Sequence, residues 1–152
     1  MKWLIFVAAA FLCWGSYGPT IHTGQKALGK PPASALQVFI CVGMAYFLVA
    51  VILPLIAMQV KGIEFSFNKE GVIWGTFAGV LGALGAFFVI LAFMNGGTPR
   101  YVMPLVFAGA PIINVIVTLI TEPPQGDVNP LMYLGFVMAA AGAGMVLYFK
   151  PH

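Results

Sequence analysis

The chain has 152 residues, of which 61% are hydrophobic and only 7% are charged. An average soluble domain carries roughly 25% charged residues, so this composition excludes a water-soluble core of this size. The formal net charge of +3 is spread over the polar connections at both faces of the predicted membrane region, which argues against a nucleic-acid-binding surface.

Five hydrophobic stretches follow one another, and all four acidic residues fall in the gaps between them. A helix rises about 1.5 Å per residue, so roughly 20 apolar residues cross the ~30 Å hydrocarbon core of a bilayer. Each stretch is long enough for this. The sequence therefore predicts an all-α integral membrane bundle of five transmembrane helices in a single domain, residues 1–152. The predicted spans are 3–22, 35–60, 71–94, 101–120 and 131–149.

The first span starts as a signal peptide would, with Lys2 followed by an apolar run. Its helix-compatible residues continue past Cys13 through Ile21, which is too long for the core of a signal peptide. We therefore expect the span to be retained. Cys13 and Cys41 both fall inside spans without histidines or carboxylates at ligand spacing, so we expect packing residues and no metal or cofactor.

The end of the first span contains a segment suited to a polar solute. Within residues 15–20, two glycines loosen the helix and Pro19 frees the carbonyl four residues earlier. The hydroxyls of Ser16, Tyr17 and Thr20 can hydrogen-bond a solute there. The alternative is a proline kink without ligand duty, because such kinks are common in membrane helices.

His22, Gln25 and Lys26 extend the first helix beyond this segment, and Pro19, His22 and Lys26 share a face at helical spacing. His22 and Lys26 are predicted to form a gate or an anion contact at the mouth of a cavity. The alternative is a solvated interfacial histidine beside a lysine that extends to the lipid headgroups.

Other polar groups lie deeper in the spans. An indole N–H or a hydroxyl inside a span needs an internal partner or a water-filled cavity, and a buried amide such as Asn114 beside Pro111 must also find partners. The alternative for each is a packing side chain with one interhelical hydrogen bond. The predicted substrate-binding residues are Trp14, Ser16, Tyr17, Thr20, Tyr46 and Asn114.

Small residues mark the predicted helix contacts. On the third span, glycines repeat every four residues and then continue as a seam, and the fifth span offers a similar surface. We expect these two spans to pack closely, although the same seam also suits a dimerisation face. The predicted packing glycines are Gly71, Gly75, Gly79, Gly82 and Gly144.

Positive charge divides almost evenly between the two sides of the membrane. Such a small bias sets orientation weakly and is compatible with insertion both ways. One side carries Lys2, Lys61 and Lys69, and the other carries Lys26, Lys30, Arg100 and Lys150.

The order of short motifs resembles a single EamA-type repeat of the drug/metabolite transporter superfamily, over nearly the whole chain. Trp14-Gly15-Ser16 is similar to an early motif of that repeat. The later landmarks are the glycine-rich run 79–86, Ala92-Phe93, Thr98, the segment 104–111, Thr121-Glu122, Gly135 and the run 141–144.

The resemblance implies one half of a ten-helix inverted-repeat transporter. Family members commonly pair two inverted five-helix repeats around a central cavity, so this chain would need a second copy, as an antiparallel homodimer, or another half-transporter as its partner. The first span lacks the glutamate that small multidrug-resistance transporters use, which disfavours proton-driven cation export.

We therefore expect a transporter of a small polar metabolite that works by alternating access, as a dimer, in the cell membrane. Its expected partners are the lipid bilayer and the solute, and not nucleic acid. The alternative is a non-transporting membrane subunit or scaffold that binds a partner membrane protein. An enzyme is disfavoured because neither histidine has a partner at recognisable spacing, so no catalytic residues are predicted.

Overall fold

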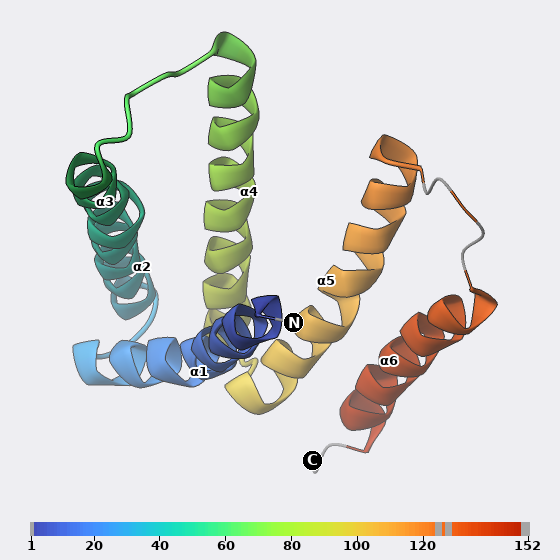
Figure 1. Ribbon diagram of the computed structural model, residues 1–152. Helices are drawn as coiled ribbons and strands as arrows, with labels where there is room; N and C mark the ends of the chain where they lie inside the picture. The colour runs from blue at the N-terminus through green and yellow to red at the C-terminus, as the bar shows by residue number, and fades with distance from the viewer. Residues whose placement is uncertain (1, 124–125, 127–128, 150–152) are drawn as a thin grey trace. The chain divides into compact units, whose positions relative to one another are not determined.

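A computed structural model describes residues 2–123, 126 and 129–149, and the elements within them are helical (Figure 1). Lys150, which entered the charge comparison, lies outside the described residues. Five helices are long and apolar enough to cross a membrane, so the prediction of an all-α chain with five membrane-length helices is confirmed. They comprise Trp3–Leu28, Ala33–Lys61, Lys69–Met94, Pro99–Thr121 and Pro130–Tyr148.

Helix α1 (Trp3–Leu28) continues past the predicted end of the first span at His22, with Pro19 inside it. The hydropathy falls after His22, but Gln25, Lys26 and the residues after them are good helix formers, so the helix persists where the apolar run does not. It stops before Gly29, whose φ of 110° lies in the left-handed region that glycine adopts without strain.

The second span is interrupted by a π-helical turn that the sequence did not predict. Helix α2 (Ala33–Phe47) leads into η1 (Leu48–Ile52), which leads into α3 (Leu53–Lys61). The Leu53 N–H donates to the Leu48 carbonyl, five residues back. Because Pro54 has no N–H to donate, the ordinary α-helical ladder cannot continue through this position, and a wider turn takes its place.

Helix α3 ends in a Schellman motif. Gly62 adopts a left-handed conformation, with φ 63° and ψ 30°. Its N–H donates to the Gln59 carbonyl at 3.3 Å, and the Ile63 N–H donates to the Met58 carbonyl at 2.9 Å. Carbonyls at the end of α3 are thereby satisfied before the chain crosses to the next helix.

The chain divides into two compact units whose boundary falls inside α1, between Gly18 and Pro19. We call Pro19–Gly96 the inner unit, and Met1–Gly18 with Gly97–His152 the terminal unit. The inner unit holds the end of α1, the segment from α2 to α3, and α4 (Lys69–Met94). The terminal unit holds the start of α1, α5 (Pro99–Thr121) and α6 (Pro130–Tyr148).

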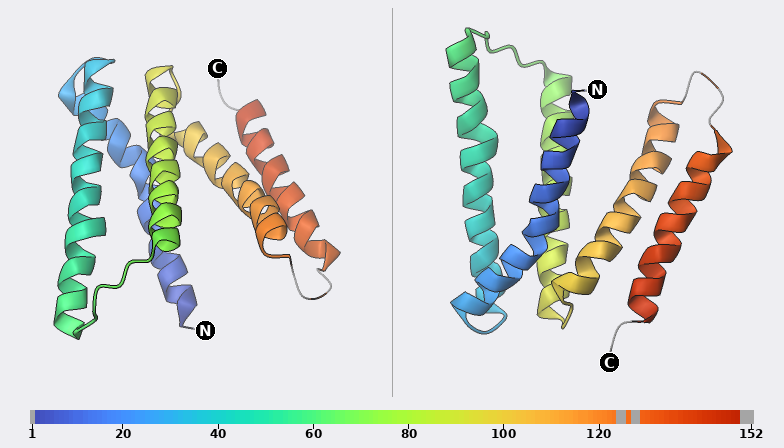
Figure 2. Two further views of the ribbon diagram at one scale, coloured as in Figure 1. Left: turned by 90° about the horizontal axis from the view of Figure 1, so that it is seen from above. Right: turned by 60° about the horizontal axis from the view of Figure 1, so that its bottom comes forward.

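The inner unit is packed at one end only. The C-terminal part of α1 lies across the ends at which α2 begins and α4 finishes (Figures 1 and 2). Phe39 of α2 and Phe87 of α4 approach to 5.3 Å between ring centroids. None of the residues from 43 to 85 is buried. The core at the packed end consists of Ile21, Ala35, Val38, Ala86, Val89, Ile90 and Phe93.

In the terminal unit, α5 packs along α6, and the start of α1 meets α5 at one close contact. Gly18 is buried against the side chain of Met103, which is itself 6% exposed. Pro99 occupies the first turn of α5, where a missing N–H is harmless, whereas Pro104 and Pro111 lie inside the helix. The Asn129 side chain accepts a hydrogen bond from the Leu131 N–H at 2.9 Å and so caps α6.

Candidate functional site

Four of the six predicted substrate-binding residues belong to the terminal unit. Ser16 is exposed, and its hydroxyl donates to the Leu12 carbonyl of the preceding turn at 2.8 Å. Tyr17 is half-buried, with its ring 5.7 Å from that of Trp14, which is 48% exposed. Asn114 is exposed on α5. Trp14, Ser16 and Asn114 are therefore accessible on the surface of their unit, whereas the hydroxyl of Tyr17 is buried.

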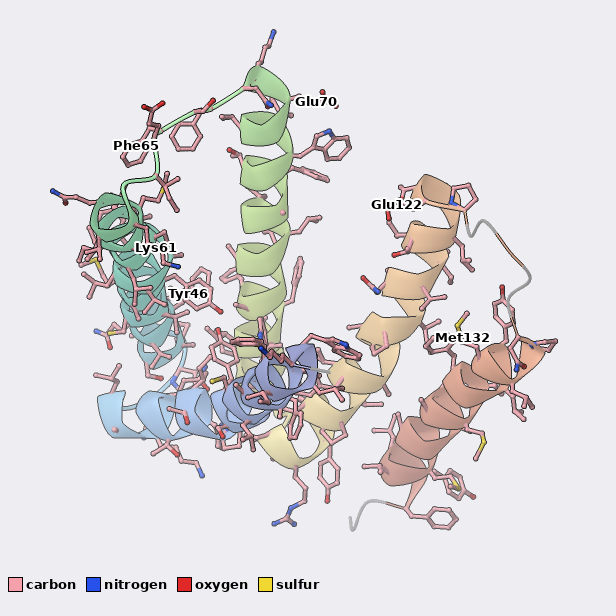
Figure 3. The ribbon with its side chains drawn as sticks, in the orientation of Figure 1. Tyr46, Lys61, Phe65, Glu70, Glu122 and Met132 are labelled. Carbon is pink, nitrogen blue, oxygen red and sulfur yellow. The ribbon has the colours of Figure 1, made fainter. Side chains whose placement is uncertain are left out.

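The other two predicted residues, Thr20 and Tyr46, belong to the inner unit. Both are exposed, and in Figure 3 the ring of Tyr46 lies on the side of α2 turned toward α4. Within neither unit do the six residues form an enclosed site. Their joint role in binding a solute therefore stays a prediction.

A group of buried polar side chains marks a different place in the inner unit. His22 Nδ1, Gln25 Nε2 and Ser34 Oγ are buried atoms without a hydrogen-bond partner in the described part of the chain. Gln25 is 7% exposed and Ser34 is 0% exposed, whereas His22 is half-buried. We call these three residues the polar junction. One of them, His22, is a predicted gate residue.

The positions of the helices explain why these side chains are enclosed. An added Cβ on Gly24 would lie 3.3 Å from Cγ2 of Val38, so α1 and α2 pack closely at this glycine. Ser34 lies four residues before Val38 and shares its face of α2. Gln25 follows Gly24 directly. The α1–α2 contact therefore places Gln25 and Ser34 in the same packed end of the unit.

Helix α4 contributes the third side of the polar junction. The imidazole of His22 meets the ring of Phe93 edge-on, with 5.5 Å between centroids and 68° between planes. Phe93 is 6% exposed and belongs to the core, and His22 and Gln25 are three residues apart on one face of α1. The polar junction thus lies where α1, α2 and α4 meet.

This arrangement opposes the forces that stabilise the rest of the unit. A buried donor or acceptor left without a partner costs about 1–3 kcal/mol, and most buried polar groups in native proteins have one. Three such atoms beside apolar core residues leave hydrogen-bonding capacity that the described residues do not satisfy. Such groups can hold a polar ligand or a bridging water.

The charges at this end of the inner unit have one sign. Lys26 at the end of α1 and Lys30 in the following connection are both exposed. The two carboxylates of the unit belong to the opposite end: Glu64 lies in the connection between α3 and α4, and Glu70 lies in the first turn of α4. Figure 3 shows Glu70 at that end. The surroundings of the polar junction are therefore electropositive.

Sequence reasoning recognised only part of this group. It identified His22 and Lys26 as residues of a cavity mouth, but it treated Gln25 as a helix extension and did not single out Ser34. A serine two residues after a pair of prolines is typical of a helix start, where it would be solvated. The burial of Ser34 could have been predicted from its position four residues before Val38, on the apolar face of the same helix.

The glycine seam of α4 is exposed on the inner unit. Gly71 lies in the first turn of α4, where its N–H donates to Oδ1 of the N-cap residue Asn68 at 2.6 Å. A Cβ added at Gly75, Gly79 or Gly82 would meet nothing within 4 Å, and the same is true of Gly144 on α6. Close packing of these glycines against another helix therefore stays a prediction. An open hollow of about 270 Å³ over the start of the seam is lined by Phe67, Gly71, Val72, Gly75 and Thr76.

Comparison with known proteins supplies no relative: no family model, no curated protein and no solved structure matches this chain. Membership of the EamA-type repeat family therefore stays a prediction from the sequence motifs. The helices, the polar junction and the charges around it are the features that bear on function.

Proposed function

We propose that this protein is a membrane transporter of a small polar metabolite that works by alternating access as a dimer of one-repeat, EamA-like subunits in the cell membrane. The observation that carries the proposal is the polar junction, which places unpartnered polar atoms of Gln25 and Ser34 inside helices of membrane-spanning length. A transported solute needs such groups, because it must exchange its hydration shell for hydrogen bonds inside the membrane protein.

The chemistry of the spans supports a polar solute rather than a cationic drug. No described residue between the first and last turns of the five helices is acidic, so the usual partner of a cation inside a membrane is missing from the described spans. The groups offered instead are hydroxyls, amides and an imidazole. They suit a neutral or zwitterionic metabolite that forms hydrogen bonds.

Dimer formation is part of the proposal because the sequence resembles a single repeat. Five helices correspond to one repeat of the inverted-repeat transporters that the sequence resembles, and a second copy would complete the cavity. The nearly even distribution of positive charge suits two copies inserted in opposite orientations.

Transport is tested with purified protein in liposomes loaded with a panel of labelled zwitterionic and neutral metabolites. We expect counterflow of at least one of them, and we expect Ser34→Ala and Gln25→Leu to reduce its rate. Ser66→Ala and Gln37→Leu are matched controls, because both residues are exposed in the same unit. Equal rates for all four variants would exclude the polar junction from the transport path.

The open glycine seam favours a second function, that of a non-transporting subunit which binds a partner membrane protein. The hollow over Gly71 and Gly75 is the kind of surface on which another membrane helix can approach the backbone closely. The two functions differ in water access to the polar junction. A transporter must admit water there in one of its states, whereas a scaffold can exclude it permanently.

Cysteine labelling separates these functions. In a background of Cys13→Ala and Cys41→Ala, the transporter proposal expects Ser34→Cys to react with a membrane-impermeant maleimide from at least one side of the bilayer. Complete protection from both sides, with Ser66→Cys labelled normally, would favour the scaffold.

A further inference from the structure

The N-terminus of α2 forms part of the polar junction. Ser34 and Ala35, in the first turn of α2, are both 0% exposed. The N-cap residue is Pro32, which has no side-chain oxygen and makes no capping hydrogen bond. The Ser34 N–H donates to the Lys30 carbonyl at 3.5 Å, and the Leu36 N–H donates to the Pro32 carbonyl at 3.3 Å. This buried helix start therefore contributes the positive end of its dipole rather than free N–H groups of these two residues.

Two side chains of the polar junction lack an acceptor. Gln25 Nε2 is a donor only, and its residue is 7% exposed. Ser34 Oγ has a hydroxyl proton to donate, and its residue is completely buried. Neither atom has a partner among residues 2–123, 126 and 129–149. The polar junction therefore combines two unpartnered side-chain donors with the start of a helix.

The electrostatic potential at this place favours a negative charge. The aligned peptide dipoles give the N-terminus of α2 a positive partial charge equivalent to roughly half an elementary charge. Lys26 and Lys30 add two positive charges near the same end of the inner unit, from which both of its carboxylates are remote in the fold. Helix N-termini with these surroundings bind carboxylates and phosphates.

We infer that the N-terminus of α2 binds an oxyanion, a carboxylate or a phosphate group, to which Ser34 Oγ and Gln25 Nε2 donate hydrogen bonds. Lys26 and Lys30 attract the anion to the site. The oxyanion belongs either to a soluble metabolite or to the headgroup of an anionic lipid. That the transported solute itself carries this group rests on the proposed function, whereas the binding site does not.

The test measures binding without transport. Purified protein in dodecyl maltoside is unfolded by heat in sodium chloride, and then with sodium phosphate or sodium acetate at the same ionic strength. An anion at saturating concentration is expected to raise the melting temperature by about 2–4 °C. This shift should persist in Ser66→Ala and Gln37→Leu and disappear in Ser34→Ala and Gln25→Leu.

A second arm identifies the source of the anion. Mixed micelles with phosphatidylglycerol are compared with mixed micelles of phosphatidylcholine, which has no net charge. A shift with phosphate or acetate assigns the site to a soluble anion, and a shift confined to phosphatidylglycerol assigns it to a lipid headgroup. In either case Lys30→Gln, at an exposed position where folding is not at risk, should weaken the response.

The inference would be overturned if no anion shifted the melting temperature, or if Ser34→Ala and Gln25→Leu responded as fully as the wild type. Counterflow measured on the same preparations separates this result from the proposed function. Transport of a neutral solute without anion binding would remove the oxyanion site and leave the transporter in place.

Discussion

Gln25 and Ser34 are buried polar residues that lower the stability of the inner unit. Their neighbours in the core are apolar, and the unpartnered amide and hydroxyl weaken the packing that Ile21, Val38 and Phe93 provide. Proteins commonly accept such a loss at a functional site. The free energy of unfolding and the rate of uptake can both be measured for substitutions at these two positions.

We predict that Gln25→Leu stabilises the protein in chloride buffer while it reduces uptake. Leucine fills a similar volume without a polar atom, so the free energy of unfolding should rise by about 1–3 kcal/mol. The measurement is thermal or denaturant unfolding in detergent, with Gln37→Leu at an exposed position as the control. A clear loss of stability would mean that the amide of Gln25 makes hydrogen bonds that hold the fold together.

At the residues predicted from sequence, we expect Tyr17→Ala and Asn114→Ala to reduce transport without preventing membrane insertion. Both side chains supply polar atoms within membrane-length helices, and neither is needed to fill the apolar core. Uptake into liposomes and the amount of protein in the membrane fraction are the two measurements. Unchanged uptake by both variants would remove these residues from the solute path.

Among the helices, α1 differs most from the simple span that hydropathy predicts. It contains Pro19, and the side chains of Ser16 and Thr23 donate to carbonyls four residues earlier, at 2.8 Å and 3.0 Å. Such local hydrogen bonds and a proline both loosen a helix. The boundary between the two compact units falls in this same segment, directly after Gly18.

We predict that Gly18→Leu destabilises the protein, because a Cβ at this position overlaps the side chain of Met103. Overpacking of this kind typically costs about 1–3 kcal/mol, measured as unfolding in detergent. Gly15→Leu is the matched control: it makes the same change one turn earlier in α1, where an added Cβ meets nothing within 4 Å. The double variant Gly18→Leu with Met103→Ala should recover stability, and no recovery would contradict the assigned contact.

At the scale of the whole molecule, the proposed transport path calls for further helices beside the five described here. The exposed seam of α4 and the unburied residues from 43 to 85 leave a large apolar surface for lipid or for another protein. A second copy in the opposite orientation would be the economical partner, because it repeats the same polar junction on the other side of the membrane.

We predict that the C-terminus is found on both sides of the membrane. Fusions to a reporter active only in the cytoplasm and to one active only outside it should both give a signal, because positive charge is nearly balanced between the two sides. Adding two lysines to one connection should shift all of the signal to one reporter. Activity of a single reporter in the unmodified chain would exclude the antiparallel homodimer and direct attention to a different partner chain.

The helical class and the five spans were predictable from the sequence because they depend on local quantities, namely the length and polarity of each stretch. The π-helical turn before Pro54 and the continuation of α1 to Leu28 shift boundaries without changing that count. Burial was different. Only the tertiary structure showed that Gln25 and Ser34 are enclosed while Trp14, Tyr46 and Asn114 are exposed, because enclosure depends on which helices meet around a side chain. The sequence determined which groups each helix carries, and the meeting of α1, α2 and α4 at Gly24, Val38 and Phe93 decided which of them are buried without a partner in the described residues.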